Sequence, residues 1–141
     1  MGVVIEFESD GVWDSLTGAL APARFQEILE DEIAIAVREG RRITLISLHL
    51  NLQSDVDLLA ALKEFATALS PLMRRGDYLA RISEYGFWIL IRGDVEAAKI
   101  GFARVAKEID VSIWRVHFCE AEVGEEMKNL LRRMDLIHFA K

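Results

Sequence analysis

A group of two arginines, a glycine and an aspartate is the feature of this sequence whose chemistry most suits ligand binding. The group is Arg74, Arg75, Gly76 and Asp77, and Arg81 follows four residues after the aspartate. Arginine guanidinium groups bind phosphate oxygens in pairs, and a carboxylate accepts hydrogen bonds from the N–H groups of a guanine edge. The Arg-x-x-Asp spacing therefore suits a guanine nucleotide. Taken alone, it is explained better as the solvated end of a helix, whose dipole the arginines offset.

The residue types that usually perform catalysis show no such grouping. The histidines at 49, 117 and 138 are not spaced from a Cys, Asp or Glu in a metal-ligand pattern, and we expect them to be packing or surface residues. Cys119 lies in an apolar run without a nucleophile signature, which predicts an inert core thiol. The sequence also lacks a glycine-rich phosphate loop. It therefore predicts no metal site, no cofactor and no catalytic residue.

Composition limits the partners and the compartment. The chain has 141 residues, enough for one domain, and a formal net charge of −6. An acidic chain is not expected to bind DNA, RNA or anionic membranes in general. The sequence has no apolar run near the ~20 residues of a membrane span, and its acidic N-terminus is unlike a signal peptide. With its single cysteine, these features predict a cytoplasmic protein.

Hydrophobic periodicity predicts the elements that must position these residues. We expect helices over Pro22–Glu39, Val56–Met73, Val95–Ile109 and Glu125–Phe139, and strands over Ile43–Leu50, Tyr78–Ser83, Phe87–Arg92 and Val111–Cys119. The first strand is apolar on most of both faces, which is typical of the interior of a helix-covered sheet. The second and third strands, separated by Glu84-Tyr85-Gly86, predict a hairpin. The mixed order predicts an α+β fold, with a single sheet of mixed strands flanked by helices.

The same periodicity predicts which side chains are buried. We expect Val37, Leu59 and Ile100 to lie on the apolar stripes of the first three helices. The aromatic residues of the strands, Phe87-Trp88 and Trp114, alternate as core residues of a sheet do, and a base-stacking platform is the less favoured interpretation.

Three stretches, in order and with suitable spacing, resemble the GGDEF domain of diguanylate cyclases. Asp14-Ser15-Leu16-Thr17-Gly18 is similar to the family's D-x-L-T-G, with Phe25 at the place of its following aromatic residue. The segment 81–87 stands where the family has R-x-G-G-D/E-E-F. Leu130-Leu131-Arg132-Arg133-Met134-Asp135, continuing to Ala140-Lys141, resembles the closing L-L-x-R-A-D-x-A-L-Y-x-A-K. The resemblance covers residues 14–141, leaves 1–13 as a lead-in, and implies the family's cyclase-like α+β sandwich.

The signature of the family is degenerate here. Ser83 and Glu84 stand at the two glycine positions, Tyr85 at the variable acid and Gly86 at the fixed glutamate, and only Phe87 agrees. In active members these glycines let GTP approach the backbone, and the acids serve metal binding and catalysis.

Other substrate and metal positions have also changed. The metal-binding D-x-D of the first strand is replaced by Ser47-Leu48-His49 or His49-Leu50-Asn51, depending on register. The loop that reads guanine is shortened after Asn51, and the family's N-R-R has become Ala21-Pro22-Ala23. Because Mg²⁺ requires oxygen ligands to hold a triphosphate, the resemblance implies a domain without diguanylate cyclase activity.

The resemblance does extend to the Arg-x-x-Asp group. In the family, an R-x-x-D whose aspartate precedes the signature arginine by four residues is an inhibitory site for cyclic di-GMP, and Arg74 and Asp77 meet this spacing relative to Arg81. By this resemblance, Arg74 would bind phosphate and Hoogsteen-edge atoms, and Asp77 would accept from a guanine N–H. Family sites recruit further arginines, and the sequence does not place Arg75 among them.

Three functions remain open from the sequence. The first is an inactive GGDEF-like signalling domain that binds cyclic di-GMP through Arg74 and Asp77 and relays it to a protein partner or a second copy. The alternative is a protein-interaction or dimerisation module that binds no nucleotide, with Arg74 and Asp77 merely pairing with each other. Its contact patch would be an exposed aromatic cluster of Tyr85, Trp88 and Trp114 near the former catalytic edge. The third, another reaction of GTP, is disfavoured by the missing metal carboxylates.

Overall fold

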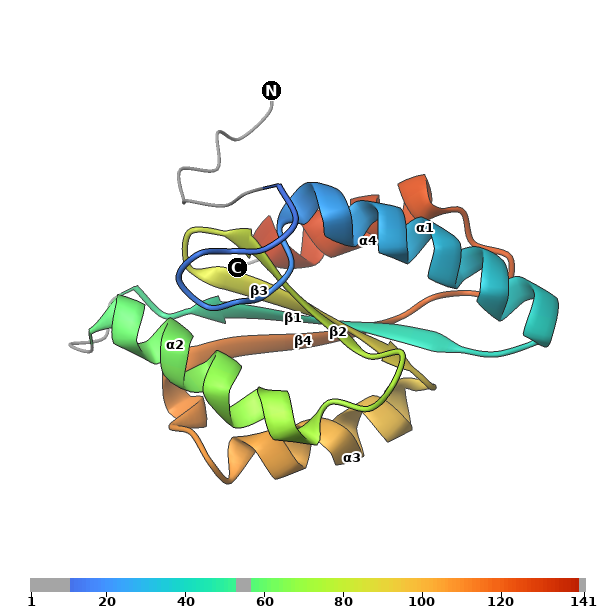
Figure 1. The fold of residues 1–141 in the computed structure, drawn as a ribbon. Helices are drawn as coiled ribbons and strands as arrows, with labels where there is room; N and C mark the ends of the chain where they lie inside the picture. The colour runs from blue at the N-terminus through green and yellow to red at the C-terminus, as the bar shows by residue number, and fades with distance from the viewer. Residues whose placement is uncertain (1–10, 53–56, 140–141) are drawn as a thin grey trace.

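A four-stranded antiparallel sheet forms the centre of the computed structural model, which describes residues 11–52 and 57–139, the last four through their backbone only (Figure 1). The strands are β1 (Ile43–Leu50), β2 (Tyr78–Ser83), β3 (Gly86–Arg92) and β4 (Trp114–Glu120), and their order across the sheet is β2-β3-β1-β4. The predicted hairpin of β2 and β3 is confirmed, and β1 lies inside the sheet between β3 and β4.

Helices cover both faces of the sheet, as the predicted α+β class requires. Helices α1 (Pro22–Glu39) and α4 (Met127–Phe139) lie on one face, and α2 (Leu58–Leu69) and α3 (Val95–Ala106) lie on the other (Figure 1). Helix α1 has the predicted bounds, with Pro22 in its first turn and Gly40 in the left-handed conformation after its last. No helix within the described ranges is both long and apolar enough to cross a membrane.

Several predicted ends were wrong for local reasons. Helix α2 stops at Leu69, and a 3₁₀ turn over Ser70–Leu72 follows because Pro71 has no N–H to continue the α-helix. Helix α3 stops at Ala106 instead of Ile109. The residues Val111–Ile113 form a 3₁₀ turn instead of the start of β4, and the side chain of Asp110 accepts from the N–H of Ser112 there.

Helix α4 begins at Met127 instead of Glu125, whose carboxylate accepts from the N–H of Glu122 in the preceding turn. The expected helix start at Val56, the closing Ala140-Lys141 and most of the lead-in lie outside the described residues. The boundary after residue 13 therefore stays a prediction.

Each face of the sheet has its own apolar core. Toward α2 and α3 the core is formed around buried residues that include Ile46, Leu48, Phe65, Phe87 and Trp114. Toward α1 and α4 it is formed around another set, which includes Phe25, Leu29, Leu45, Trp88 and Leu90. Strand β1 contributes to both cores, which explains its apolar character on both faces.

The predicted helix stripes were wrong at one position each. Val37, Leu59 and Ile100 are exposed, whereas Glu32 of α1 is buried. Periodicity favours the apolar residue at such borderline positions, but Glu32 is buried because Arg92 of β3 pairs with it.

The proposed aromatic contact patch was also wrong. Trp88 is only 8% exposed and Trp114 only 7%. Trp114 packs against Phe65 and Phe87 at ring-centroid distances of 5.1 and 6.0 Å. Tyr85 is half-buried against the same core. These aromatic side chains therefore stabilise the core and offer no exposed cluster.

Candidate functional site

The Arg74–Asp77 segment forms a tight turn closed by the aspartate itself. The N–H of Asp77 donates to the carbonyl oxygen of Arg74 at 3.0 Å, and the N–H of Arg74 donates back to Asp77 Oδ2 at 3.0 Å. Gly76 has φ +91°, a conformation that favours glycine. Arg74 and Asp77 do pair, but through the backbone of Arg74, so this pairing leaves the guanidinium available for other contacts.

A further contact orients the Asp77 carboxylate. Its Oδ1 accepts from the N–H of Arg92, the last residue of β3, at 3.4 Å. Each carboxylate oxygen has two acceptor sites, so both oxygens keep one for a ligand. Asp77 is half-buried and therefore presents an oriented acceptor at the surface.

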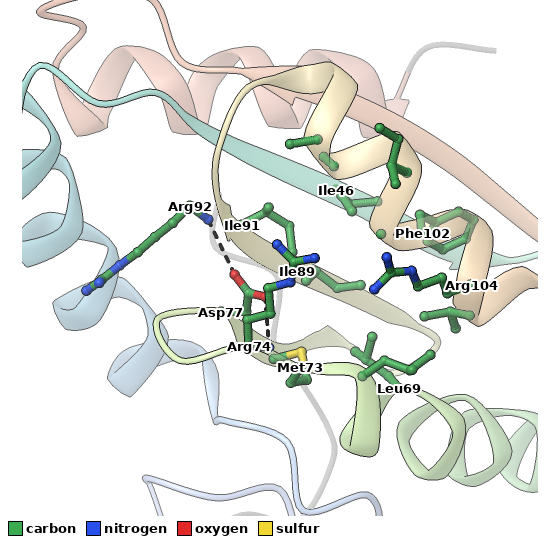
Figure 2. Close-up of a pocket in the computed structure, with 16 residues that line it drawn as sticks. Ile46, Leu69, Met73, Arg74, Asp77, Ile89, Ile91, Arg92, Phe102 and Arg104 are labelled. Atoms are coloured by element: carbon green, nitrogen blue, oxygen red, sulfur yellow. Dashed lines mark hydrogen bonds between the residues drawn. The ribbon is translucent and has the colours of Figure 1, made fainter.

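This carboxylate lines a pocket of about 220 Å³ between β3, α3 and the end of α2 (Figure 2). Its floor is apolar and is formed by residues such as Ile46, Leu69, Ile89, Phe102 and Val105. Its polar lining comes from Arg74, Asp77, Arg92 and Arg104, and the exposed side chains of Leu72 and Ile100 add apolar surface. The pocket thus combines arginines and an oriented carboxylate with surfaces on which a planar ring can pack.

Arg104 is the residue of this pocket that the sequence analysis missed. It extends from α3 into the pocket and is itself exposed (Figure 2). Its neighbour Val105 is buried, so the phase of the helix was a usable signal that Arg104 flanks the core. Arg75 is exposed and is not among the residues that line the pocket.

Arg92 has a different role, because its charge is already neutralised. Its guanidinium binds the carboxylate of Glu32 through Nη2 at 2.7 Å and through Nε at 3.2 Å. This hydrogen bonding raises the pKa of the Arg92 guanidinium. Arg92 is therefore a structural residue beside the pocket.

The β2–β3 hairpin carries the segment that the resemblance aligns with the family's signature, and it lies against the end of β1. The N–H of Leu50 donates to the carbonyl oxygen of Tyr85 at 3.0 Å. Gly86 is so close to β1 that an added Cβ would lie 2.7 Å from Ser83 Oγ and 3.3 Å from the carbonyl oxygen of Leu48. Ser83 Oγ is buried and lacks a hydrogen-bond partner among the described residues, and Glu84 is exposed.

A buried ion pair connects this hairpin to the loop before α1. Arg81 Nη1 binds Asp14 Oδ1 at 3.0 Å, and Arg81 Nη2 donates to the carbonyl oxygen of Glu84 at 2.7 Å. Asp14 Oδ2 in turn accepts from the N–H of Thr17 at 3.0 Å. The first and second resembling stretches are therefore in direct contact.

Solved GGDEF domains have the same fold as this chain. The GGDEF domain of DgcB from Caulobacter crescentus, solved in complex with cyclic di-GMP, matches with a TM-score of 0.77 at 16% identity, over 94% of this chain and 91% of that one. The FimX GGDEF domain from Pseudomonas aeruginosa matches with a TM-score of 0.69 at 20% identity, over 86% and 87%. The chain has the GGDEF-domain fold. The fold that the three sequence stretches implied is thus confirmed.

A third GGDEF-fold neighbour was solved together with a protein. The diguanylate cyclase SiaD from Pseudomonas aeruginosa, in complex with its activator SiaC, matches with a TM-score of 0.74 at 21% identity, over 87% of this chain and 55% of SiaD. No sequence-family model and no curated protein sequence matches the chain. The likeness is therefore one of fold, and the functional argument depends on this chain's own residues.

The end of β1 lies beside the β2–β3 hairpin, where the resemblance places the family's metal-binding positions. Ser47 pairs with Trp88 and His49 pairs with Gly86 across the β1–β3 ladder, so Ser47 and His49 share one face there. His49 Nδ1 lies 2.9 Å from the carbonyl oxygen of Leu50. Among the side chains of residues 11–52 and 57–135, three or more His, Cys, Asp or Glu do not converge as a metal site would require. The pocket of Arg74, Asp77 and Arg104 places two arginines and an oriented carboxylate together, as an anionic ligand with hydrogen-bond donors would require.

Proposed function

We propose that this protein is a catalytically inactive GGDEF-like signalling domain that binds cyclic di-GMP in the pocket of Arg74, Asp77 and Arg104. The observation that carries the proposal is the convergence of these three side chains, from two separate segments of the chain, over one apolar pocket. The ligand combines guanine bases with phosphates. The pocket offers a carboxylate for a guanine N–H and two guanidinium groups for phosphate oxygens.

The chemistry of each contact follows from the geometry. The Asp77 carboxylate, oriented by the N–H groups of Arg74 and Arg92, would accept from a guanine N–H. The Arg74 and Arg104 guanidinium groups would bind phosphate oxygens and the Hoogsteen edge. Charge-assisted contacts contribute roughly 1.5–3 kcal/mol each. Three of them plus apolar packing suffice for a dissociation constant near the micromolar range, which corresponds to a binding free energy of about −8 kcal/mol.

The proposed lack of cyclase activity rests on the hairpin and on β1. Gly86 stands at the position of the family's fixed glutamate, and its surroundings leave no room for a side chain without displacement of Ser83 or β1. The facing strand offers Ser47 and His49, where hard oxygen ligands would be needed to hold Mg²⁺. We therefore expect no cyclic di-GMP when the chain is incubated with GTP and Mg²⁺.

Transmission of the cyclic di-GMP signal to a protein partner is part of the same proposal. The support for it is the fold neighbour SiaD, which was solved in complex with an activator protein. A nucleotide-independent interaction module remains the alternative, although Trp88 and Trp114 of the aromatic patch that favoured it are buried.

Calorimetric titration of the purified chain with cyclic di-GMP tests the proposal. We expect micromolar binding that is lost in Arg74→Ala and retained in Arg75→Ala. Arg75 is the matched control, because it is an exposed arginine of the same turn that does not line the pocket. Absence of binding to the unaltered chain, or equal loss in both variants, would overturn the assignment and favour the interaction module.

A further inference from the structure

Arg92 connects the Arg74–Asp77 turn to helix α1 on the opposite face of the sheet. Its backbone N–H donates to Asp77 Oδ1 at the pocket, whereas its side chain extends away from the pocket, as Figure 2 shows. On the face of the sheet covered by α1, its Nε and Nη2 donate hydrogen bonds to the Glu32 carboxylate. One residue therefore contacts the ligand-binding turn with its main chain and α1 with its side chain.

The turn also rests on the Arg92 side chain. A Cβ added to Gly76 would lie 2.4 Å from Arg92 Nε and 2.6 Å from Cδ and Cζ. The Gly76 backbone is therefore in close contact with the guanidinium, and the position of Arg92 limits where the turn can lie.

Glu32 determines where the Arg92 guanidinium lies. It is buried on α1 among the apolar core residues Phe25, Leu29 and Ala36. A buried carboxylate without a cationic partner is costly, so Glu32 keeps the guanidinium in one place. The bidentate geometry also restricts the rotation of the guanidinium.

We propose that Arg92, held by Glu32, is a positioning residue of the nucleotide pocket. It supports Gly76 and orients the Asp77 carboxylate, and it does not bind the ligand itself because Glu32 already neutralises it. This inference rests on the proposed function, since it explains how that pocket is preorganised for its ligand.

Glu32→Gln separates positioning from simple electrostatics. Removal of a negative charge near the pocket would tighten binding of an anionic ligand if charge alone mattered. Loss of positioning predicts the opposite, and we expect cyclic di-GMP to bind about tenfold more weakly, which equals about 1.4 kcal/mol. Arg92→Lys, which keeps the charge but not the bidentate geometry, should weaken binding in the same direction.

The matched control is Glu125→Gln, in an ion pair away from the pocket. The Glu125 and Arg133 side chains are 2% and 33% exposed, close to the 5% and 30% of Glu32 and Arg92. We expect this control to lower the melting temperature by a similar amount and to leave the cyclic di-GMP affinity unchanged. Unchanged or tighter binding by Glu32→Gln, or equal weakening by both variants, would overturn the proposal.

Amide hydrogen exchange of the ligand-free chain keeps the two proposals separable. Glu32→Gln should accelerate exchange of the Arg74 and Asp77 N–H groups, which close the turn, and Glu125→Gln should not. If the unaltered chain does not bind cyclic di-GMP, the proposed function fails, but faster exchange would still support the positioning of the turn. Unaltered exchange in both Glu32→Gln and Arg92→Lys would overturn it.

Discussion

The Asp14–Arg81 ion pair should be among the strongest polar contributions to the stability of this domain. The Asp14 and Arg81 side chains are 0% and 4% exposed and meet at 3.0 Å. Removing one partner of such a pair leaves a buried charge uncompensated, which costs about 3–5 kcal/mol. Asn at position 14 keeps one oxygen acceptor for Arg81 or Thr17, so we expect Asp14→Asn to cost about 3 kcal/mol, the lower end of that range.

This loss is a large part of the total, because a domain of ordinary size is stable by only about 5–15 kcal/mol. Urea unfolding followed by circular dichroism measures it directly. The control is Glu27→Gln, since the Arg24–Glu27 pair is exposed on both sides and such pairs contribute at most about 1 kcal/mol. The double variant Asp14→Asn/Arg81→Met should lose less stability than the sum of the two single variants, because the buried guanidinium that Asp14→Asn leaves without its carboxylate is then absent. A loss for Asp14→Asn as small as the control's would refute the reasoning.

Three further outcomes are expected. Arg104→Ala should weaken cyclic di-GMP binding about tenfold in calorimetry, because it removes one exposed charge-assisted contact worth about 1.5 kcal/mol; unchanged affinity would exclude Arg104 from the site. Gly86→Glu should yield no cyclase activity with GTP and Mg²⁺ and should lower the stability by about 1–3 kcal/mol through overpacking, part of it recovered by Ser83→Gly; product formation would refute the expectation that several missing groups, and not this acid alone, prevent activity. Burial favours a raised pKa at Glu125, but hydrogen bonds from Glu122 and Arg133 leave this pKa lowered on balance. The ionised Glu125 therefore stabilises the fold above its unfolded pKa, this contribution is lost as the pH falls through the folded pKa, and Glu125→Gln should flatten the acid limb of a stability–pH curve.

Backbone preferences and apolar patterns within short segments explain why much of the fold could be predicted from the sequence. Pro22 and Gly40 have backbone preferences that delimit α1 by themselves, and they do so at the predicted residues. The apolar run of Ile43–Leu50 predicted an interior strand, because only a strand covered on both faces can bury both sets of side chains. The order of three short stretches that resemble the family predicted the GGDEF fold, although the solved structures compared above are at most 21% identical to this chain.

The site was readable only in part. The spacing of Arg74 and Asp77 relative to Arg81 identified the turn, since all three belong to one short segment. Arg104 was missed, because its place at the same pocket as Asp77 depends on how α3 packs on the sheet, against β1 and β4. The alternation of Phe87-Trp88 and Trp114 correctly predicted core residues, whereas the aromatic patch, which was inferred from their place near the former catalytic edge, was wrong because both faces of the sheet are covered by helices.

By itself, the sequence determined the order of the elements and most of their bounds, because these depend on backbone preferences and on residues close together in the chain. Tertiary structure alone decided that Glu32 is buried against Arg92, that Val37 and Ile100 face solvent, and that Arg104 joins Arg74 and Asp77 at one pocket. The physical reason is that burial and charge pairing depend on which surfaces meet across the sheet, and those surfaces come from segments tens of residues apart.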